Sequence, residues 1–178
     1  SVLSWAGRGD VLRVTELSSG AARSLARGAL LPAWLDERQL AWVTYEEGGP
    51  ALVRVKALDT GAEHELARFE GRLLALALHA AGPRLAVVVA AADGSQELRL
   101  RDLATGAEEQ LARGLAYDHP SFSPDGRWLA WSGPLLAGDA RSNGVWLAQP
   151  GRGEPRRVAL DGHGPVWSAD GRSLYFSR

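Results

Sequence analysis

Two stretches of the chain are near-copies of each other: Pro120-Ser-Phe-Ser-Pro-Asp-Gly-Arg-Trp-Leu-Ala-Trp131 and Pro165-Val-Trp-Ser-Ala-Asp-Gly-Arg-Ser-Leu-Tyr-Phe176. Each copy places an aromatic residue before a serine, then an Asp-Gly pair, then a leucine in an apolar run. Leu129 and Leu174 hold the same place in the two copies, 45 residues apart. An internal repeat of this length decides the architecture before any single motif is considered.

Weaker copies extend the repeat toward the N-terminus. Leu40 and Leu85 occupy the leucine place there, so the four leucines are spaced 45, 44 and 45 residues apart. A second landmark, a Leu-x-x-Gly turn, recurs in phase with the first at spacings of 41 and 45 residues: Leu17-Ser-Ser-Gly20, Leu58-Asp-Thr-Gly61 and Leu103-Ala-Thr-Gly106. Two landmarks in one phase, with a period near 45 residues, are typical of a β-propeller.

Each repeat is expected to form four antiparallel strands, a to d. Strand a carries 120–123, the Asp-Gly pair makes a hairpin turn, and strand b is an apolar run such as 128–131. Strand c alternates, as in 98–101, and strand d is shorter and more polar. Helix is the competing interpretation for 62–68 and 107–114, which contain good helix formers. The regular Gly and Pro punctuation favours strands.

The predicted fold is therefore an all-β propeller of about four repeats of roughly 45 residues, forming one domain, 1–178. Its expected parts are a partial blade at 1–28, three whole blades and a partial blade at 163–178; the whole blades cover 29–72, 73–115 and 116–162. We expect part of a larger six- to eight-bladed ring, with a four-bladed ring or a ring shared by two chains as alternatives. Open propeller edges would favour self-association.

Composition excludes several classes of function. The net charge is −1, so no basic field attracts nucleic acid. There is no cysteine for thiol chemistry, and no apolar run has the length of a membrane-spanning helix. No Gly-x-Ser-x-Gly elbow is present, so we expect no catalysis by this chain. The four histidines lack metal-ligand spacing, so no metal or cofactor is expected; they are His64, His79, His119 and His163.

At Ser123-Pro-Asp-Gly-Arg127 and Ser168-Ala-Asp-Gly-Arg172 the chain resembles the TolB-like, WD40-like propeller repeats of bacteria. The resemblance implies a non-enzymatic scaffold for protein partners, in a periplasmic or other extracytoplasmic location. It equally implies two alternatives. One is the accessory or gating propeller of a serine peptidase of the prolyl oligopeptidase type, or of another hydrolase, with its catalytic domain outside this chain. The other is the sensor propeller of a membrane-bound regulator or kinase.

Features that do not repeat are the candidates for binding. The connection 133–143 is the longest insertion, and it is expected on the same face as the d–a connections. Trp146 stands where other repeats have Arg13, Arg54 and Arg99, so its ring is expected to face outward. An ordinary variable surface loop is the competing interpretation. The predicted partner contacts are Tyr117, Asp118, His119, Asp139, Arg141, Asn143, Trp146 and His163.

Overall fold

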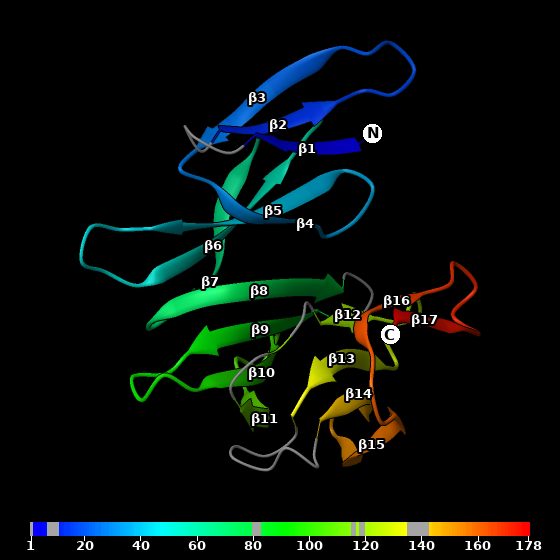
Figure 1. Cartoon of the computed structure of the whole chain (residues 1–178). Coiled ribbons are helices and arrows are strands. Elements are labelled where there is room, and N and C mark those ends of the chain that lie inside the picture. The colour runs from blue at the N-terminus through cyan, green and yellow to red at the C-terminus, as the bar shows by residue number, and fades with distance from the viewer. Residues whose placement is uncertain (1, 7–10, 80–82, 115–116, 118–119, 135–142) are drawn as a thin grey trace. The chain divides into compact units, whose positions relative to one another are not determined.

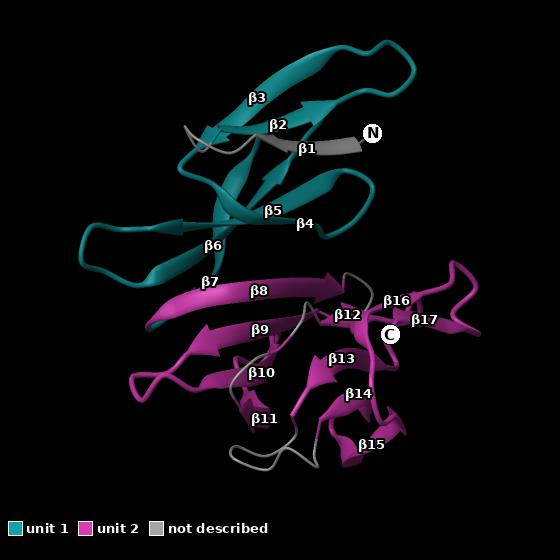
Figure 2. Ribbon diagram, viewed as in Figure 1, with its two compact units in different colours: residues 1–70 teal, residues 71–178 magenta. Residues whose placement is uncertain are grey.

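The computed structural model describes residues 2–6, 11–79, 83–114, 117, 120–134 and 143–178, with only the backbone for 2–6. Every regular element in these ranges is a β-strand, and each strand pairs antiparallel with its neighbours (Figure 1). Within the same ranges no helix has the length and hydrophobicity needed to cross a membrane. The chain divides into two compact units, 1–70 and 71–178 (Figure 2).

The first unit holds two sheets, which we call blades 1 and 2. Blade 1 has the order β1 (Val2–Ala6), β2 (Val11–Thr15), β3 (Ala22–Arg27). Blade 2 has the order β4 (Leu30–Trp34), β5 (Gln39–Tyr45), β6 (Ala51–Ala57), β7 (Glu63–Phe69). Leu12 and Val14 pack with Leu40 and Trp42 in one buried cluster, so the two blades share a core.

The second unit holds blades 3, 4 and 5. Blade 3 consists of β8 (Arg72–His79), β9 (Arg84–Ala90), β10 (Gln96–Asp102) and β11 (Glu108–Gly114). Blade 4 consists of β12 (Ser121–Phe122), β13 (Leu129–Gly133), β14 (Gly144–Gln149) and β15 (Arg152–Ala159). Blade 5 has two strands, β16 (His163–Trp167) and β17 (Leu174–Ser177). The four strands of blades 2, 3 and 4 supply positions a to d in chain order.

The predicted all-β fold of four-stranded antiparallel blades is confirmed, as a partial propeller of about four blades. The two segments with helix-forming composition are strands β7 and β11. In β11 the exposed residues come first and the buried Ala112 and Gly114 alternate with half-buried neighbours, as a strand that packs on one face requires. Tertiary packing therefore overrides the local helix propensity.

Strand b of each complete blade is buried on both faces. The adjacent residues Leu85 and Ala86 on β9, and Leu129 and Ala130 on β13, point to opposite faces and are all fully buried. In the second unit the buried side chains of blades 3 and 4 form one cluster that joins Ala86 and Val88 to Trp131. Apolar runs without alternation are expected where a strand lies between two neighbouring sheets.

The Asp-Gly turns of the repeat are closed by their own side chains. The Ser123 hydroxyl donates to Asp125 Oδ1 at 2.6 Å and accepts from the backbone N–H of Trp128 at 3.0 Å. Gly126 has a φ of 66°, which favours glycine. Blade 5 repeats this arrangement, with the Ser168 hydroxyl donating to Asp170 at 2.6 Å. Both serines are thus committed to a structural role.

The a–b turns of blades 4 and 5 also touch the blade before them. A Cβ placed on Gly126 would collide with the imidazole of His79, whose Nε2 lies 3.1 Å from the Pro124 carbonyl oxygen. A Cβ on Gly171 would lie 3.4 Å from Pro124 Cδ. The Trp167 indole N–H donates to the Ser121 carbonyl at 3.0 Å. His79 and Trp167 therefore join successive blades.

Candidate functional site

A cavity of about 470 Å³ lies at the end of blade 4 where its b–c and d–a connections meet. Its described lining comes from the ends of β13 and β14, from a residue before blade 4, from the connection that leaves β15, and from the first residue of β16. The lining residues are Tyr117, Ser132, Gly133, Asn143, Gly144, Leu160, Asp161, Gly162 and His163. A volume of this size is within the range of ligand-binding pockets.

The structure brings three of the predicted contact residues to this cavity. Tyr117 and Asn143 lie on two separate connections and His163 is the first residue of β16, yet all three line the cavity. Asn143 and His163 are exposed and Tyr117 is half-buried. Four further predicted contacts lie outside the described residues: Asp118, His119, Asp139 and Arg141.

The eighth predicted contact, Trp146, is not where the sequence placed it. Its ring is only 7% exposed and belongs to the buried cluster between blades 3 and 4, so the expectation of an outward-facing ring is wrong. Trp146 lies opposite Trp131 in the β13–β14 register, and both rings occupy the same face of the sheet. A large apolar ring gains more from burial there than an arginine would.

The polar edge of Trp146 bonds to a residue that lines the cavity. Its indole N–H donates to the Gly133 carbonyl at 3.1 Å. Arg157 lies opposite Trp146 on β15, with its guanidinium carbon 5.6 Å from the centre of the indole ring. One guanidinium nitrogen of Arg157 donates to the Asn143 carbonyl at 3.3 Å. Both ends of the b–c connection therefore contact this pair.

Tyr117 supplies the buried wall of the cavity. Its backbone N–H donates to Gln96 Oε1 at 3.1 Å, which fixes the backbone at the start of blade 4. Burial raises the pKa of the Tyr117 phenol, so the hydroxyl stays protonated at neutral pH. Among the described residues that buried hydroxyl has no hydrogen-bond partner.

The opposite rim combines an apolar side chain with an ion pair. Leu160 is 72% exposed, an unusual value for a large apolar residue. Asp161 pairs with Arg178 at 3.3 Å, and both side chains are exposed. This rim therefore presents an exposed apolar side chain beside an ion pair, and the ion pair carries no net charge.

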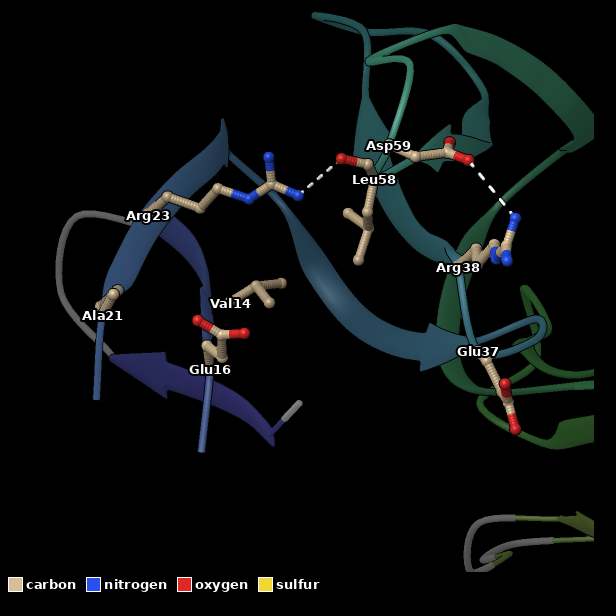
Figure 3. A pocket seen from close by; sticks show the side chains of 9 residues that line it. Val14, Glu16, Ala21, Arg23, Glu37, Arg38, Leu58 and Asp59 are labelled. Carbon is tan, nitrogen blue, oxygen red and sulfur yellow. Dashed lines mark hydrogen bonds and ion pairs between the residues drawn. The ribbon is translucent and has the colours of Figure 1, made fainter. Parts of the chain in front are cut away.

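A second cavity, of about 460 Å³, lies within the first unit (Figure 3). Arg23 reaches across it to donate to the Leu58 carbonyl at 2.7 Å, and Arg38 pairs with Asp59 at 3.9 Å. On one side it is lined by Val14, Glu16 and 21–23. A smaller cavity of about 200 Å³ in the second unit uses the equivalent places of blade 3, namely Leu100, Asp102 and 107–109. The groove recurs because the blades recur, so we assign it to the repeat architecture.

The sequence-based prediction missed two lining residues of the blade 4 cavity, Leu160 and Ser132, and Arg157, which bonds to the lining residue Asn143. The repeat does not mark Arg157, because the corresponding places on strand d of the other blades hold Ser24, Glu65 and Gln110. For Leu160 the sequence gives no indication of a role in binding, apart from an apolar residue in a connection. Among the described residues, no group of three histidine or acidic side chains could hold a metal ion.

Comparisons with known proteins agree on the fold. The chain is similar to TolB from Acinetobacter baumannii, with 18% identity and a TM-score of 0.74 over 94% of this chain and 43% of that one. It is also similar to an oligogalacturonate lyase from Vibrio parahaemolyticus, with 15% identity and a TM-score of 0.64 over 93% of this chain and 53% of that one. A third likeness is to an acylaminoacyl peptidase from Pyrococcus horikoshii, with 14% identity and a TM-score of 0.59 over 83% of this chain and 28% of that one.

These likenesses are at low identity and concern the fold alone. The chain spans about half or less of the length of each of these three structures. No curated protein matches its sequence. The family model described as the TolB beta propeller domain, however, matches residues 22–178, which is most of the chain. Together with the antiparallel blades and the Asp-Gly turns, this match shows that the chain belongs to the TolB beta propeller domain family.

Proposed function

We propose that this chain is a non-enzymatic propeller scaffold that binds a protein partner at the cavity of blade 4. The observation that carries the proposal is the convergence of Tyr117, Asn143 and His163 on that cavity from two connections and the start of β16. Binding residues concentrate on connections that a rigid scaffold holds in place. Asp118, His119, Asp139 and Arg141 flank these residues in the sequence and are included as polar contacts.

The chemistry of the rim favours a polypeptide segment as the ligand. Exposed Leu160 offers an apolar anchor, while Asn143 and His163 offer hydrogen-bonding side chains. Protein interfaces combine an apolar centre with a polar rim in this way. Asp161 is already paired with Arg178, so the site does not select for a strongly charged ligand.

Site-specific photo-crosslinking tests this proposal. A benzophenone amino acid at position 160 reports on the cavity rim, and the same group at position 17 is the matched control, since Leu17 is 67% exposed on a turn of blade 1. In extract from the source cells, we expect one protein to be captured at 160 and not at 17. Equal capture at both positions would contradict the assigned face.

The captured partner then permits a binding measurement. Replacing 139–143 with a Gly-Ser segment removes three of the predicted side chains, so we expect at least ~10-fold weaker binding by calorimetry. Replacing Asp59 by alanine, in the recurrent groove of the first unit, is the control and should leave the affinity unchanged. Unchanged affinity after the loop replacement would contradict the proposal.

The alternative roles predict different protein segments encoded before or after this chain in the same gene. An α/β-hydrolase segment with a nucleophile elbow beyond Arg178 would favour the accessory propeller of a peptidase or other hydrolase. A membrane-spanning segment before Ser1 would favour the sensor propeller. Sequencing the complete gene separates these roles from the scaffold.

A further inference from the structure

We infer that Trp146 and Arg157 form a clamp that fixes both ends of the b–c loop of blade 4 and so positions the rim of the cavity. Its consequence for binding rests on the proposed function, whereas the clamp itself can be tested without a partner. Neither residue needs to touch the partner, so both are positioning residues.

Trp146 holds the first end of the loop. Its indole N–H donates to the carbonyl of Gly133, the last residue of β13, at 3.1 Å. The ring itself is 7% exposed and packs in the core of blades 3 and 4. Because a packed ring has little freedom to move, its N–H is a fixed donor for the backbone at that point.

Arg157 holds the second end. It donates to the Asn143 carbonyl at 3.3 Å, one residue before β14 begins at Gly144. Its guanidinium carbon lies 5.6 Å from the centre of the Trp146 ring, within the range of a cation–π contact. The two residues therefore support each other across the strands while each binds one end of the loop.

Gly144 shows how closely the clamp approaches the backbone. A Cβ at this position would lie 2.6 Å from Arg157 Cδ and would also collide with the Ala159 carbonyl oxygen. The aliphatic part of Arg157 thus packs directly against the start of β14. Glycine at 144 is required by this contact, which a larger residue would break.

Blade 3 shows that the clamp is not part of the repeat. Arg99 occupies the place of Trp146, and Gln110 occupies the place of Arg157. Arg99 pairs with Glu97 and Glu108 rather than with its b–c connection. That connection spans only 91–95, whereas the one in blade 4 spans 134–143. The two departures from the repeat thus occur together with the longer loop.

The clamp bears on binding because Gly133 and Asn143 both line the cavity. A rim that is already held in its binding arrangement loses less conformational entropy when a partner docks. Releasing either end should therefore weaken binding even though the cavity side chains are unchanged.

The decisive variants are Trp146→Phe and Arg157→Gln. The first keeps an aromatic ring but removes the donor to Gly133, and the second removes the guanidinium group. Trp131→Phe is the matched control, because its indole N–H has no hydrogen-bond partner among the described residues. Arg157→Lys keeps a cationic donor and should restore the wild-type behaviour in part.

Hydrogen exchange of the peptide 133–145, read by mass spectrometry, reports on the clamp directly. We expect exchange to rise about fivefold in Trp146→Phe and in Arg157→Gln, as for the loss of one hydrogen bond, and trypsin to cut faster after Arg141. Trp131→Phe should change neither. Unchanged exchange in both clamp variants, or an equal rise in the control, would overturn the inference. If Trp146→Phe does not fold, Arg157→Gln, with its exposed site, still decides.

Affinity for the captured partner separates the two proposals. Faster exchange together with weaker binding supports both. Faster exchange with unchanged binding supports the clamp and contradicts its effect on binding, while unchanged binding after the loop replacement contradicts the proposed binding face. Weaker binding after the loop replacement with unchanged exchange in the clamp variants supports the binding face and overturns the clamp.

Discussion

Blades 3 and 4 share their strand order and nearly share their register, yet they use the same place on strand c in opposite ways. In blade 3 Arg99 bonds to Glu97 at 2.6 Å and to Glu108 at 3.0 Å. In blade 4 Trp146 is buried, and its polar edge faces the b–c loop. The arginine at this place forms ion pairs within its own sheet, whereas the indole packs in the core and bonds to the backbone at the start of the loop.

The b–c connections follow the same division. In blade 3 the Asp93 carboxylate accepts from the hydroxyl and the backbone N–H of Ser95, at 2.6 and 3.0 Å, and pairs with Arg113 at 2.7 Å. In blade 4 the indole of Trp146 and the guanidinium of Arg157 take over this role. In a repeat protein, a blade that holds its loop with different residues from the other blades is therefore a good candidate for a functional site.

Trp146 and Arg99 hold the same place on strand c, and replacing each by alanine should give the largest difference in the free energy of unfolding. Trp146→Ala removes a buried ring and should lower the free energy of unfolding by about 3–5 kcal/mol. Arg99→Ala removes partly exposed ion pairs, and Glu97 keeps Arg113 at 3.4 Å, so its loss should be at most about 1 kcal/mol. Urea unfolding followed by fluorescence measures both. Equal losses would remove the distinction between the two blades.

Ser123→Ala tests the repeated part of blade 4. The hydroxyl is buried, and its removal leaves the Trp128 N–H without its acceptor, while Asp125 keeps its bonds to Arg127, so we expect a loss of about 1–3 kcal/mol in urea unfolding. Ser168→Ala is the control, because the same bonds in blade 5 are more exposed to water. A larger loss for Ser168→Ala would contradict the structural role assigned to burial at this turn.

A charge exchange should convert blade 4 toward the pattern of blade 3. Trp146→Arg places an arginine directly opposite Arg157, where like charges repel. Adding Arg157→Glu should recover about 0.2–1 kcal/mol in a double-mutant cycle, since opposite charges then face each other. A coupling energy of zero would mean that the register does not bring these two places together.

Acid should loosen the b–c turn of blade 3 but not the loop ends of blade 4. Hydrogen bonds from the Ser95 side chain and backbone lower the pKa of Asp93 to about 2. Because this pKa is lower in the folded state, the carboxylate stabilises the turn above about pH 4, and the effect is lost as the pH falls toward 2. The Ser95 amide signal in NMR should titrate in that window and the Trp146 indole signal should not. Asp93→Asn should abolish the Ser95 titration.

The blades could be predicted from the sequence because their landmarks repeat in phase. The Asp-Gly turns at 125 and 170 need glycine for its positive φ, and their serines close the same hydrogen bonds in both copies. A conformational requirement that recurs at a fixed spacing leaves a mark in the sequence itself. For the same reason the strands β7 and β11 could be predicted against their helix propensity.

The cavity could be predicted only in part. The topology places the b–c and d–a connections at one end of a blade, which was enough to bring Asn143 and His163 together. It could not show that the Trp146 ring turns inward, because strand alternation alone does not tell an arginine that bonds within the sheet from an indole that enters the core. Arg157 was missed because its role depends on the backbone positions of 133 and 143, which no residue pattern records.

In the second unit, the contacts around the a–b turns of blades 4 and 5 join each of these blades to the blade that precedes it in the chain. Gly126 meets His79 of the preceding blade, and Trp167 donates back to Ser121. Since a chain emerges from the ribosome N-terminus first, each new turn finds the surface that it needs already made. Assembly can then proceed blade by blade, with every finished blade serving as the template for the next.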